Sequence, residues 1–229
     1  MSIRTTAART TLAAALAASA ALGLAACGND DSSAAASPAA ATSSTTHPSA
    51  VATVPAVKGG TTAVALDSGF TQALTSLGLT PGTVGTATLT GTTVSFPITG
   101  GTVTLYDKAT GYRPWVQGVL FHEGSGLSLT AGGTTVQLTD FTIDPGKPAR
   151  LFGNVSVNGQ PAVASAPLFD LNGKNLGAPT TDANGNTVLS GTQVTISPEA
   201  AALLDQTFKT DAVKGGLLVG TSTITVQTK

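Results

Sequence analysis

The side chains that could bind a ligand or take part in chemistry are concentrated at His122 and in the residues just before it. His122 is the only histidine between residues 61 and 229, and Tyr106, Tyr112, Arg113 and Trp115 come shortly before it. A tyrosinate or an imidazole can ligate ferric haem, and an arginine can bind a propionate group. The same residues also suit a structural role, in which the imidazole forms a hydrogen bond at a strand end and the aromatic rings fill the rim of a core. The sequence leaves both interpretations open.

Acidic residues give two further candidate sites. Asp140 and Asp144 are four residues apart in a predicted strand, so their carboxylates are expected on the same side, either paired for acid–base chemistry or calcium, or simply facing solvent. Asp182 begins the segment Asp-Ala-Asn-Gly-Asn, which imitates the start of a calcium-binding loop, but no Glu stands at its twelfth position and an Asn-Gly turn explains it better. No nucleophile elbow is present either. We therefore predict a non-enzymatic protein without a metal site.

The composition excludes several classes of protein. Charged residues make up 10% of the chain and aromatic residues 4%, while Thr, Ala, Gly and Val dominate, which favours short strands joined by tight turns. The formal net charge is −1 and no basic cluster is present, so nucleic acid is not an expected partner. The single cysteine, Cys27, lies near the N-terminus, so the rest of the chain can form neither an internal disulfide nor a thiolate metal site.

The N-terminal residues have the pattern of an export signal. Residues 1–9 are short and basic, residues 10–23 are apolar, and Leu24-Ala25-Ala26-Cys27 follows at once. The apolar run is too short to span a bilayer, which needs roughly twenty residues. The Leu-Ala-Ala-Cys segment resembles the lipobox of bacterial prolipoproteins, which implies a signal peptide over residues 1–26 and a lipid-bearing Cys27 on the outer face of the cell membrane. An ordinary secreted protein with a free Cys27 is the alternative.

A spacer is predicted between this signal and the folded domain. Residues 27–60 are rich in Ser, Thr, Ala and Pro, show no apolar periodicity and contain only Asp30, Asp31 and Lys58 as charged residues. Such a composition favours disorder. His47 lies in this spacer with no second histidine, cysteine or carboxylate near enough to share a metal, so we expect it to be inert.

Residues 61–229 are predicted to form one β-rich domain. Asn158-Gly159, Asn172-Gly173 and Asn184-Gly185 favour tight turns, so at least two hairpins between antiparallel strands are expected. The fold class we predict is mainly β, an antiparallel β-sandwich-like domain with two short amphipathic helices. The β-branched or alternating runs that predict strands are Val94 to Ile98, Val116 to Phe121, Leu127 to Leu129, Thr135 to Ile143, Leu151 to Val157 and Val163 to Leu171.

Two segments have helical rather than β periodicity. Residues 68–77 carry apolar side chains at helical spacing, with Asp67 as the expected N-cap and Gly78 at the end. Ser197-Pro198 opens the second helix in the favoured order of N-cap and first-turn proline. Similar sequences flank the two helices: residues 64–67 match 194–197, and residues 84–90 match 219–225. A strand-helix-strand duplication is therefore one hypothesis, and chance similarity in a Thr-rich chain is the other.

The middle of the domain contains a series of short motifs, followed by a closing segment. They are Phe96 to Val103, Tyr106-Asp107, Thr110-Gly111, Gly118 to Leu127, Leu138 to Asp144 and the closing segment Thr195 to Ala202. These motifs resemble the Htaa-type surface domains of high-GC Gram-positive bacteria. The resemblance implies a β-rich extracellular domain that binds haem in some members, through a tyrosine in an N-terminal segment and a histidine in the region of His122. Residues 68–77 contain no tyrosine, so the resemblance transfers only His122.

Two functions of different class follow from these features. As a binding module, the domain would present a groove near His122, Tyr106 and Tyr112, with Arg113 beside it, to haem or another flat apolar ligand. As a structural or adhesion module of the cell envelope, it would bind no small molecule. The distinguishing feature is an apolar pocket, because a ligand site requires one and an adhesion surface does not.

Overall fold

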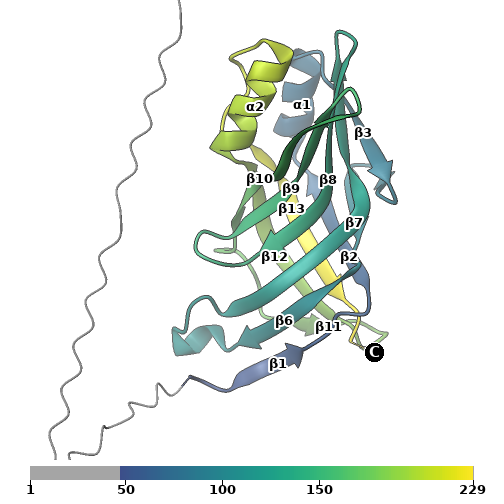
Figure 1. Ribbon diagram of the computed structural model, residues 1–229. Helices are drawn as coiled ribbons and strands as arrows, with labels where there is room; N and C mark the ends of the chain where they lie inside the picture. The colour runs from purple at the N-terminus through teal and green to yellow at the C-terminus, as the bar shows by residue number, and fades with distance from the viewer. Residues whose placement is uncertain (1–46, 229) are drawn as a thin grey trace, which may run out of the picture. The chain divides into compact units, whose positions relative to one another are not determined.

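The computed structural model of the chain describes residues 47–228, so the predicted signal peptide and Cys27 lie outside the described residues. Strands dominate this part, and none of its helices is long and apolar enough to span a membrane (Figure 1). Its elements are β1 (Ala50–Val54), β2 (Gly60–Leu66), α1 (Ser68–Ser76), β3 (Thr80–Gly85), β4 (Thr88–Thr90), β5 (Thr93–Pro97), β6 (Gly100–Tyr106), η1 (Lys108–Thr110), β7 (Val116–Ala131), β8 (Thr134–Asp144), β9 (Arg150–Val157), β10 (Gln160–Asn172), β11 (Thr180–Thr181), β12 (Thr187–Ile196), α2 (Pro198–Phe208) and β13 (Leu218–Val226).

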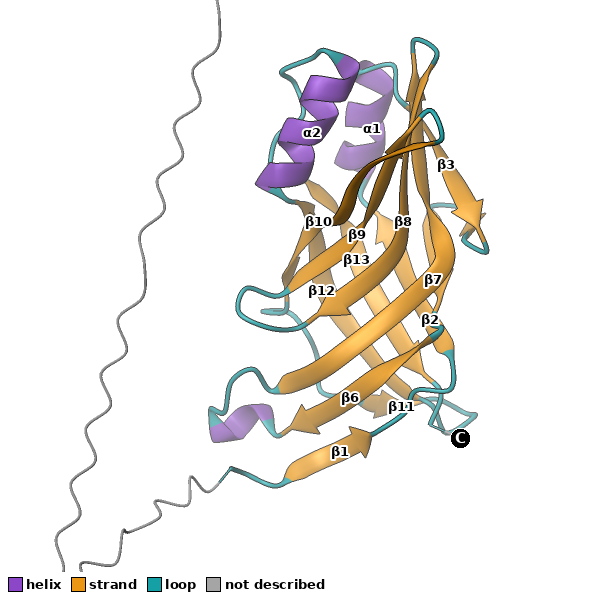
Figure 2. Ribbon diagram, viewed as in Figure 1, coloured by secondary structure: helices purple, strands orange, loops and turns teal. Residues whose placement is uncertain are grey.

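The described strands form one sheet rather than two separate ones. Its order is β1-β6-β7-β8-β9-β10-β12-β13-β2-β5-β4, with β11 beside β12 and with β3 and β6 pairing successive halves of β7. Every recorded pair is antiparallel, which confirms the predicted mainly antiparallel β class. The sheet curls until β7 to β9 lie over β12, β13 and β2 (Figure 2). The two layers expected of a sandwich are therefore two halves of one curled sheet.

Both predicted helices are present, at one end of the sheet. Asp67 caps α1 by accepting hydrogen bonds from the backbone N–H groups of Gly69 and Phe70. Ser197 caps α2 by accepting from the N–H of Ala200 at 2.9 Å, while its own hydroxyl donates to the Pro167 carbonyl. These caps satisfy backbone donors that the first helical turn leaves without partners, which explains why both helices begin where the sequence predicts.

Two salt bridges of Arg150 connect α2 to the sheet. Arg150 on β9 lies 3.0 Å from the carboxylate of Asp170 on β10 and 2.9 Å from that of Glu199 in the first turn of α2. The Arg150 guanidinium lowers the pKa of the Glu199 carboxyl by a hydrogen bond to its charged form. The negative charge of Glu199 also suits the N-terminal end of the helix dipole.

The buried apolar side chains form two clusters. The first, which we call the helix-end core, joins Leu74 of α1 and Leu204 of α2 to strand residues such as Val155, Phe141 and Leu168. The second, which we call the η1-end cluster, includes Val54, Leu105, Leu120 and Ile143 from β1, β6, β7 and β8, together with Trp115 just before β7. One curled sheet therefore has two separate apolar centres, and only the first is covered by helices.

The folded domain begins earlier than the sequence predicts. Residues 27–60 were expected to be a disordered spacer, but Ala50–Val54 forms β1 and pairs with β6. Val54 and Val57 are buried. The prediction was wrong for this part of the spacer because alternating Ala, Val and Thr residues give a weak local signal, and the strand depends on a partner about fifty residues away for its hydrogen bonds. Residues 27–46 lie outside the described part.

The turn and duplication hypotheses have mixed outcomes. Asn158 and Gly159 both have positive φ and join β9 to β10 in the expected hairpin. The Asn172-Gly173 pair instead opens a longer connection to β11. The two strand-helix units are similar up to the helices, but residues 84–90 are divided between β3 and β4 whereas residues 219–225 lie in the single strand β13. The proposed duplication therefore does not extend past the helices in the fold.

Candidate ligand-binding site

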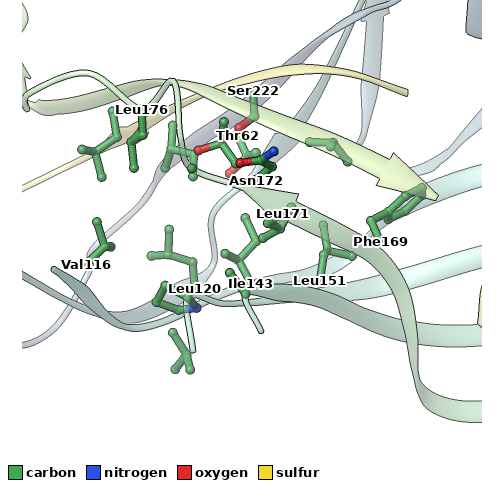
Figure 3. Close-up of a pocket in the computed structure, with 18 of the residues that line it drawn as sticks. Thr62, Val116, Leu120, Ile143, Leu151, Phe169, Leu171, Asn172, Leu176 and Ser222 are labelled. Carbon is green, nitrogen blue, oxygen red and sulfur yellow. The ribbon is translucent and has the colours of Figure 1, made fainter. Parts of the chain in front are cut away.

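A cavity of about 690 Å³ lies inside the curled sheet. Its wall includes side chains of both apolar clusters, for example Phe141 from the helix-end core and Leu120 from the η1-end cluster. Leu120, Ile143, Leu151 and Leu171 come from four consecutive strands of the sheet order, β7 to β10, and approach the cavity together in the close-up (Figure 3). The volume falls within the roughly 300–1,000 Å³ of small-molecule sites. The pocket that distinguishes a binding module from an adhesion surface is therefore present.

His122 projects from β7 into this cavity and is 1% exposed. Its Nδ1 lies 3.2 Å from the carbonyl oxygen of Phe141, and its Nε2 lies 2.8 Å from the hydroxyl of Thr62. Because a carbonyl oxygen only accepts, Nδ1 carries the proton in the neutral ring. Nε2 is then the unprotonated nitrogen and accepts from the Thr62 hydroxyl, which is the tautomer of a histidine that binds a metal through Nε2.

Burial keeps this imidazole neutral. Loss of hydration lowers the pKa of His122 from 6.5 to about 4, and the hydrogen bond to the Phe141 carbonyl opposes the shift only in part. Two other buried hydroxyl side chains, Thr192 on β12 and Ser222 on β13, face each other across neighbouring strands in the cavity wall. The interior therefore combines apolar walls with a small neutral polar patch.

The solvent end of the cavity is basic. Lys108 follows β6, Lys147 lies between β8 and β9, and Lys174 follows β10, and all three are exposed side chains in the cavity lining together with Arg113. The Lys108 ammonium donates to the carbonyl of Leu176 at 3.2 Å and lies 5.7 Å from the centre of the Trp115 ring. We call these four cations the basic mouth.

The structure separates the residues that the sequence grouped together. His122 and Arg113 line the cavity, whereas Tyr106 and Tyr112 do not. The two tyrosine rings pack edge to face at 4.7 Å, and the hydroxyl of Tyr112 lies 3.1 Å from Nδ1 of His47. The predicted groove shared by His122, Tyr106 and Tyr112 is therefore not formed. His47, which was predicted to lie in a disordered spacer, precedes β1 and contacts Tyr112 after η1, while its predicted inertness stays a prediction.

The acidic candidates do not form a site. Asp140 has a positive φ of 55° in a bulge of β8, and the bulge shifts the buried positions from Val136 and Leu138 to Phe141 and Ile143. The carboxylate of Asp140 accepts from the side-chain amide of Asn154 at 3.2 Å, and that of Asp144 accepts from the N–H of Gly146 at 2.9 Å, so each carboxylate is used in its own local structure. A hydrogen bond from the Gly124 N–H lowers the Asp140 pKa.

Asp182 accepts from the N–H groups of Asn184 and Asn186 within the predicted Asn-Gly turn. Among the described residues, no group of three potential metal ligands is present.

Comparisons with known proteins agree with this architecture. No family model matches the sequence, and no curated protein matches it significantly. Among solved structures, the C-terminal domain of HtaA from Corynebacterium glutamicum is similar, with a TM-score of 0.50 and 15% sequence identity over 75% of this chain and 98% of that domain. The agreement covers almost the whole of that domain, as the sequence resemblance predicts. The described part of this chain therefore has the fold of an HtaA-type domain.

Proposed function

We propose that this chain is a non-enzymatic, cell-surface binding protein that holds an apolar small molecule in its interior cavity, and that haem is the first ligand to test. The cavity carries the proposal, because its apolar walls enclose an imidazole whose unprotonated Nε2 faces a single hydroxyl. The HtaA-type fold supports a haem-related role. The cavity also favours a binding module over an adhesion module without a ligand.

The residues of the cavity fit haem in three respects. His122 is neutral over the physiological range, as an iron ligand must be, and its Nδ1–H donor to Phe141 fixes the ring orientation. The apolar walls suit a porphyrin face, and the basic mouth suits propionate groups. Haem bound there would supply a ferric centre, and Thr62 would have to give up its hydrogen bond to Nε2.

A haemin titration of the chain carrying Cys27→Ser, followed in the Soret region, tests this proposal. We expect a saturable, shifted band that His122→Gln abolishes, because Gln keeps hydrogen-bonding capacity but cannot replace the imidazole. Thr62→Val is the sharper variant: it removes the hydroxyl that occupies Nε2 and should tighten binding.

Tyr106→Phe and Tyr112→Phe serve as matched controls outside the cavity. A band lost only in Tyr112→Phe would place haem at the tyrosine and His47 instead and would contradict the cavity site. Spectra that follow free haemin in every variant would exclude haem as the ligand.

We also propose that lipid on Cys27 tethers the domain to the outer face of the cell membrane. The support is the basic and apolar N-terminal sequence that ends in Leu-Ala-Ala-Cys. Metabolic labelling with palmitate in a bacterial host should mark the wild-type chain and not Cys27→Ser, and the variant should appear in the culture medium. Equal labelling of both chains, or none in either, would contradict lipid anchoring.

A further inference from the structure

Charged residues are distributed very unequally around the cavity. Between residues 47 and 228 the chain has eight Lys and Arg residues, and four of them, the basic mouth, line the cavity. None of the ten Asp and Glu residues in the same range lines it. For a chain whose overall net charge is only −1, the cavity entrance is therefore a local centre of positive charge.

Within residues 47–228, no recorded ion pair neutralises these four positive charges. In the described part of the chain, the recorded ion pairs both belong to Arg150, which is bound to Asp170 and Glu199. Asp107 and Asp144 lie close in sequence to Lys108 and Lys147, but their carboxylates accept hydrogen bonds from backbone groups. Asp107 accepts from the N–H of Ala109 at 2.8 Å, and Asp144 accepts from the N–H of Gly146 at 2.9 Å. The mouth is thus free to bind an external anion.

The apolar depth and the cationic rim fit the two ends of one kind of molecule. We propose that the cavity takes a long-chain carboxylic acid, which inserts its hydrocarbon chain among residues such as Leu120 and Phe169 and leaves its carboxylate at the basic mouth. Burying the chain is favourable by about 25 cal/mol per Å² of apolar surface, whereas burying the carboxylate would not be, so this orientation is the stable one. The inference rests on the proposed binding cavity but not on haem.

Lys108 is the central residue of this arrangement. Its ammonium group joins η1 to the segment after β10 through the Leu176 carbonyl and lies over the ring of Trp115, which lines the cavity. A carboxylate at the mouth would meet Lys108 on one side and Lys147 or Lys174, from two other loops, on the other. Three separate chain segments therefore supply the charges, which makes the anion site a property of the folded domain.

The test uses a fluorescent polyene fatty acid and its methyl ester, titrated into the full chain carrying Cys27→Ser. The two probes share their hydrocarbon chain and differ in charge. We expect the acid to bind about tenfold more tightly than the ester at low salt, because only the acid can form two or three partly exposed ion pairs with the lysines of the mouth. The advantage should shrink as added salt shortens the Debye length.

A triple variant of the mouth, Lys108→Gln with Lys147→Gln and Lys174→Gln, should weaken the acid about tenfold and leave the ester unchanged. The matched control, Lys58→Gln with Lys209→Gln and Lys214→Gln, removes the same charge from positions outside the cavity and should change neither affinity.

Equal affinities for acid and ester, or equal losses in the two triple variants, would overturn the headgroup inference and leave the cavity function standing. Failure of both probes to bind would overturn the cavity function and this inference with it.

Discussion

The two ends of the curled sheet bury apolar side chains in different ways. At the helix end, α1 and α2 place Leu74 and Leu204 in the helix-end core. At the η1 end no described α-helix covers the strands, and loops that carry cations surround a cavity of about 690 Å³. Similar antiparallel strands thus give a filled core where a helix supplies the opposing apolar face and a ligand-sized space where none does.

Truncating one leucine at each end is the strongest test of this difference. Leu168 is 1% exposed in the helix-end core, whereas Leu120 borders the cavity. Leu168→Ala should lower the free energy of unfolding by about 2–5 kcal/mol, because it leaves a new void in a packed region. Leu120→Ala should cost only about 1–2 kcal/mol, since its side chain already lacks neighbours on one side. Urea unfolding followed by circular dichroism measures both, and equal losses would show that the cavity end is packed as densely as the other.

Acidification should destabilise the fold through His122, the imidazole buried in the cavity wall. The pKa of His122 is about 4 in the folded protein against 6.5 for an unburied imidazole, so the unfolded chain binds more protons between these values. Stability must therefore fall as the pH drops from 6.5 to 4, by about 3 kcal/mol in total. His122→Gln should remove this loss. Thermal unfolding of both chains at several pH values provides the measurement, and parallel curves would mean that His122 is solvated in the folded state.

Enlarging one valine away from the cavity and one that lines it should separate stability from binding. Val155 and Val194 both belong to the helix-end core, but only Val194 lines the cavity. Val155→Phe should destabilise the domain by about 1–3 kcal/mol through overpacking. Val194→Phe has space to enter, so it should change stability by less than about 1 kcal/mol while it blocks the fatty-acid probe. Unchanged probe affinity in Val194→Phe would place the ligand elsewhere.

Modest losses of stability without a change in binding are expected at the helix caps. Ser197 is fully buried and makes two hydrogen bonds, so Ser197→Ala should cost about 1–2 kcal/mol. Asp67 caps α1 from a partly exposed position, and Asp67→Ala should cost about 0.5–1 kcal/mol. Neither variant should alter ligand affinity, because the caps belong to the helix end. Chemical denaturation and the probe titration together check this, and a weakened probe would show that the helices also shape the cavity.

The parts of the fold that the sequence predicts are those with a local physical cause. Asp67, Ser197-Pro198 and Asn158-Gly159 each determine backbone geometry within a few residues, and the structure confirms all three. The bulge at Asp140 appears in the sequence only as two adjacent polar residues, Thr139 and Asp140, that interrupt the apolar alternation, and the prediction of one strand from Thr135 to Ile143 did not use this break.

The candidate site was predicted only in part for a related reason. His122 could be singled out because it is rare and the resemblance includes it, and Arg113, which was grouped with it, lines the same cavity. The other mouth cations, Lys108, Lys147 and Lys174, are spread over sixty-six residues of sequence, so no basic cluster is visible before the strands pair. Likewise, the Thr62 partner of His122 is sixty residues away. Their proximity follows from the pairing of the strands, which the sequence alone does not reveal.

The position of β1 has a mechanical consequence. If lipid on Cys27 holds the chain at the membrane, any drag on the domain enters the described structure through β1, an edge strand of five residues with β6 as its recorded partner. Most of its side chains are exposed, and only Val54 is buried. Force would therefore peel β1 first and lengthen the tether by about 17 Å, at roughly 3.4 Å per residue, while the cavity strands stay paired. Unpairing of β1 would therefore take up extension between the anchor and the ligand site before the strands around the cavity bear the force.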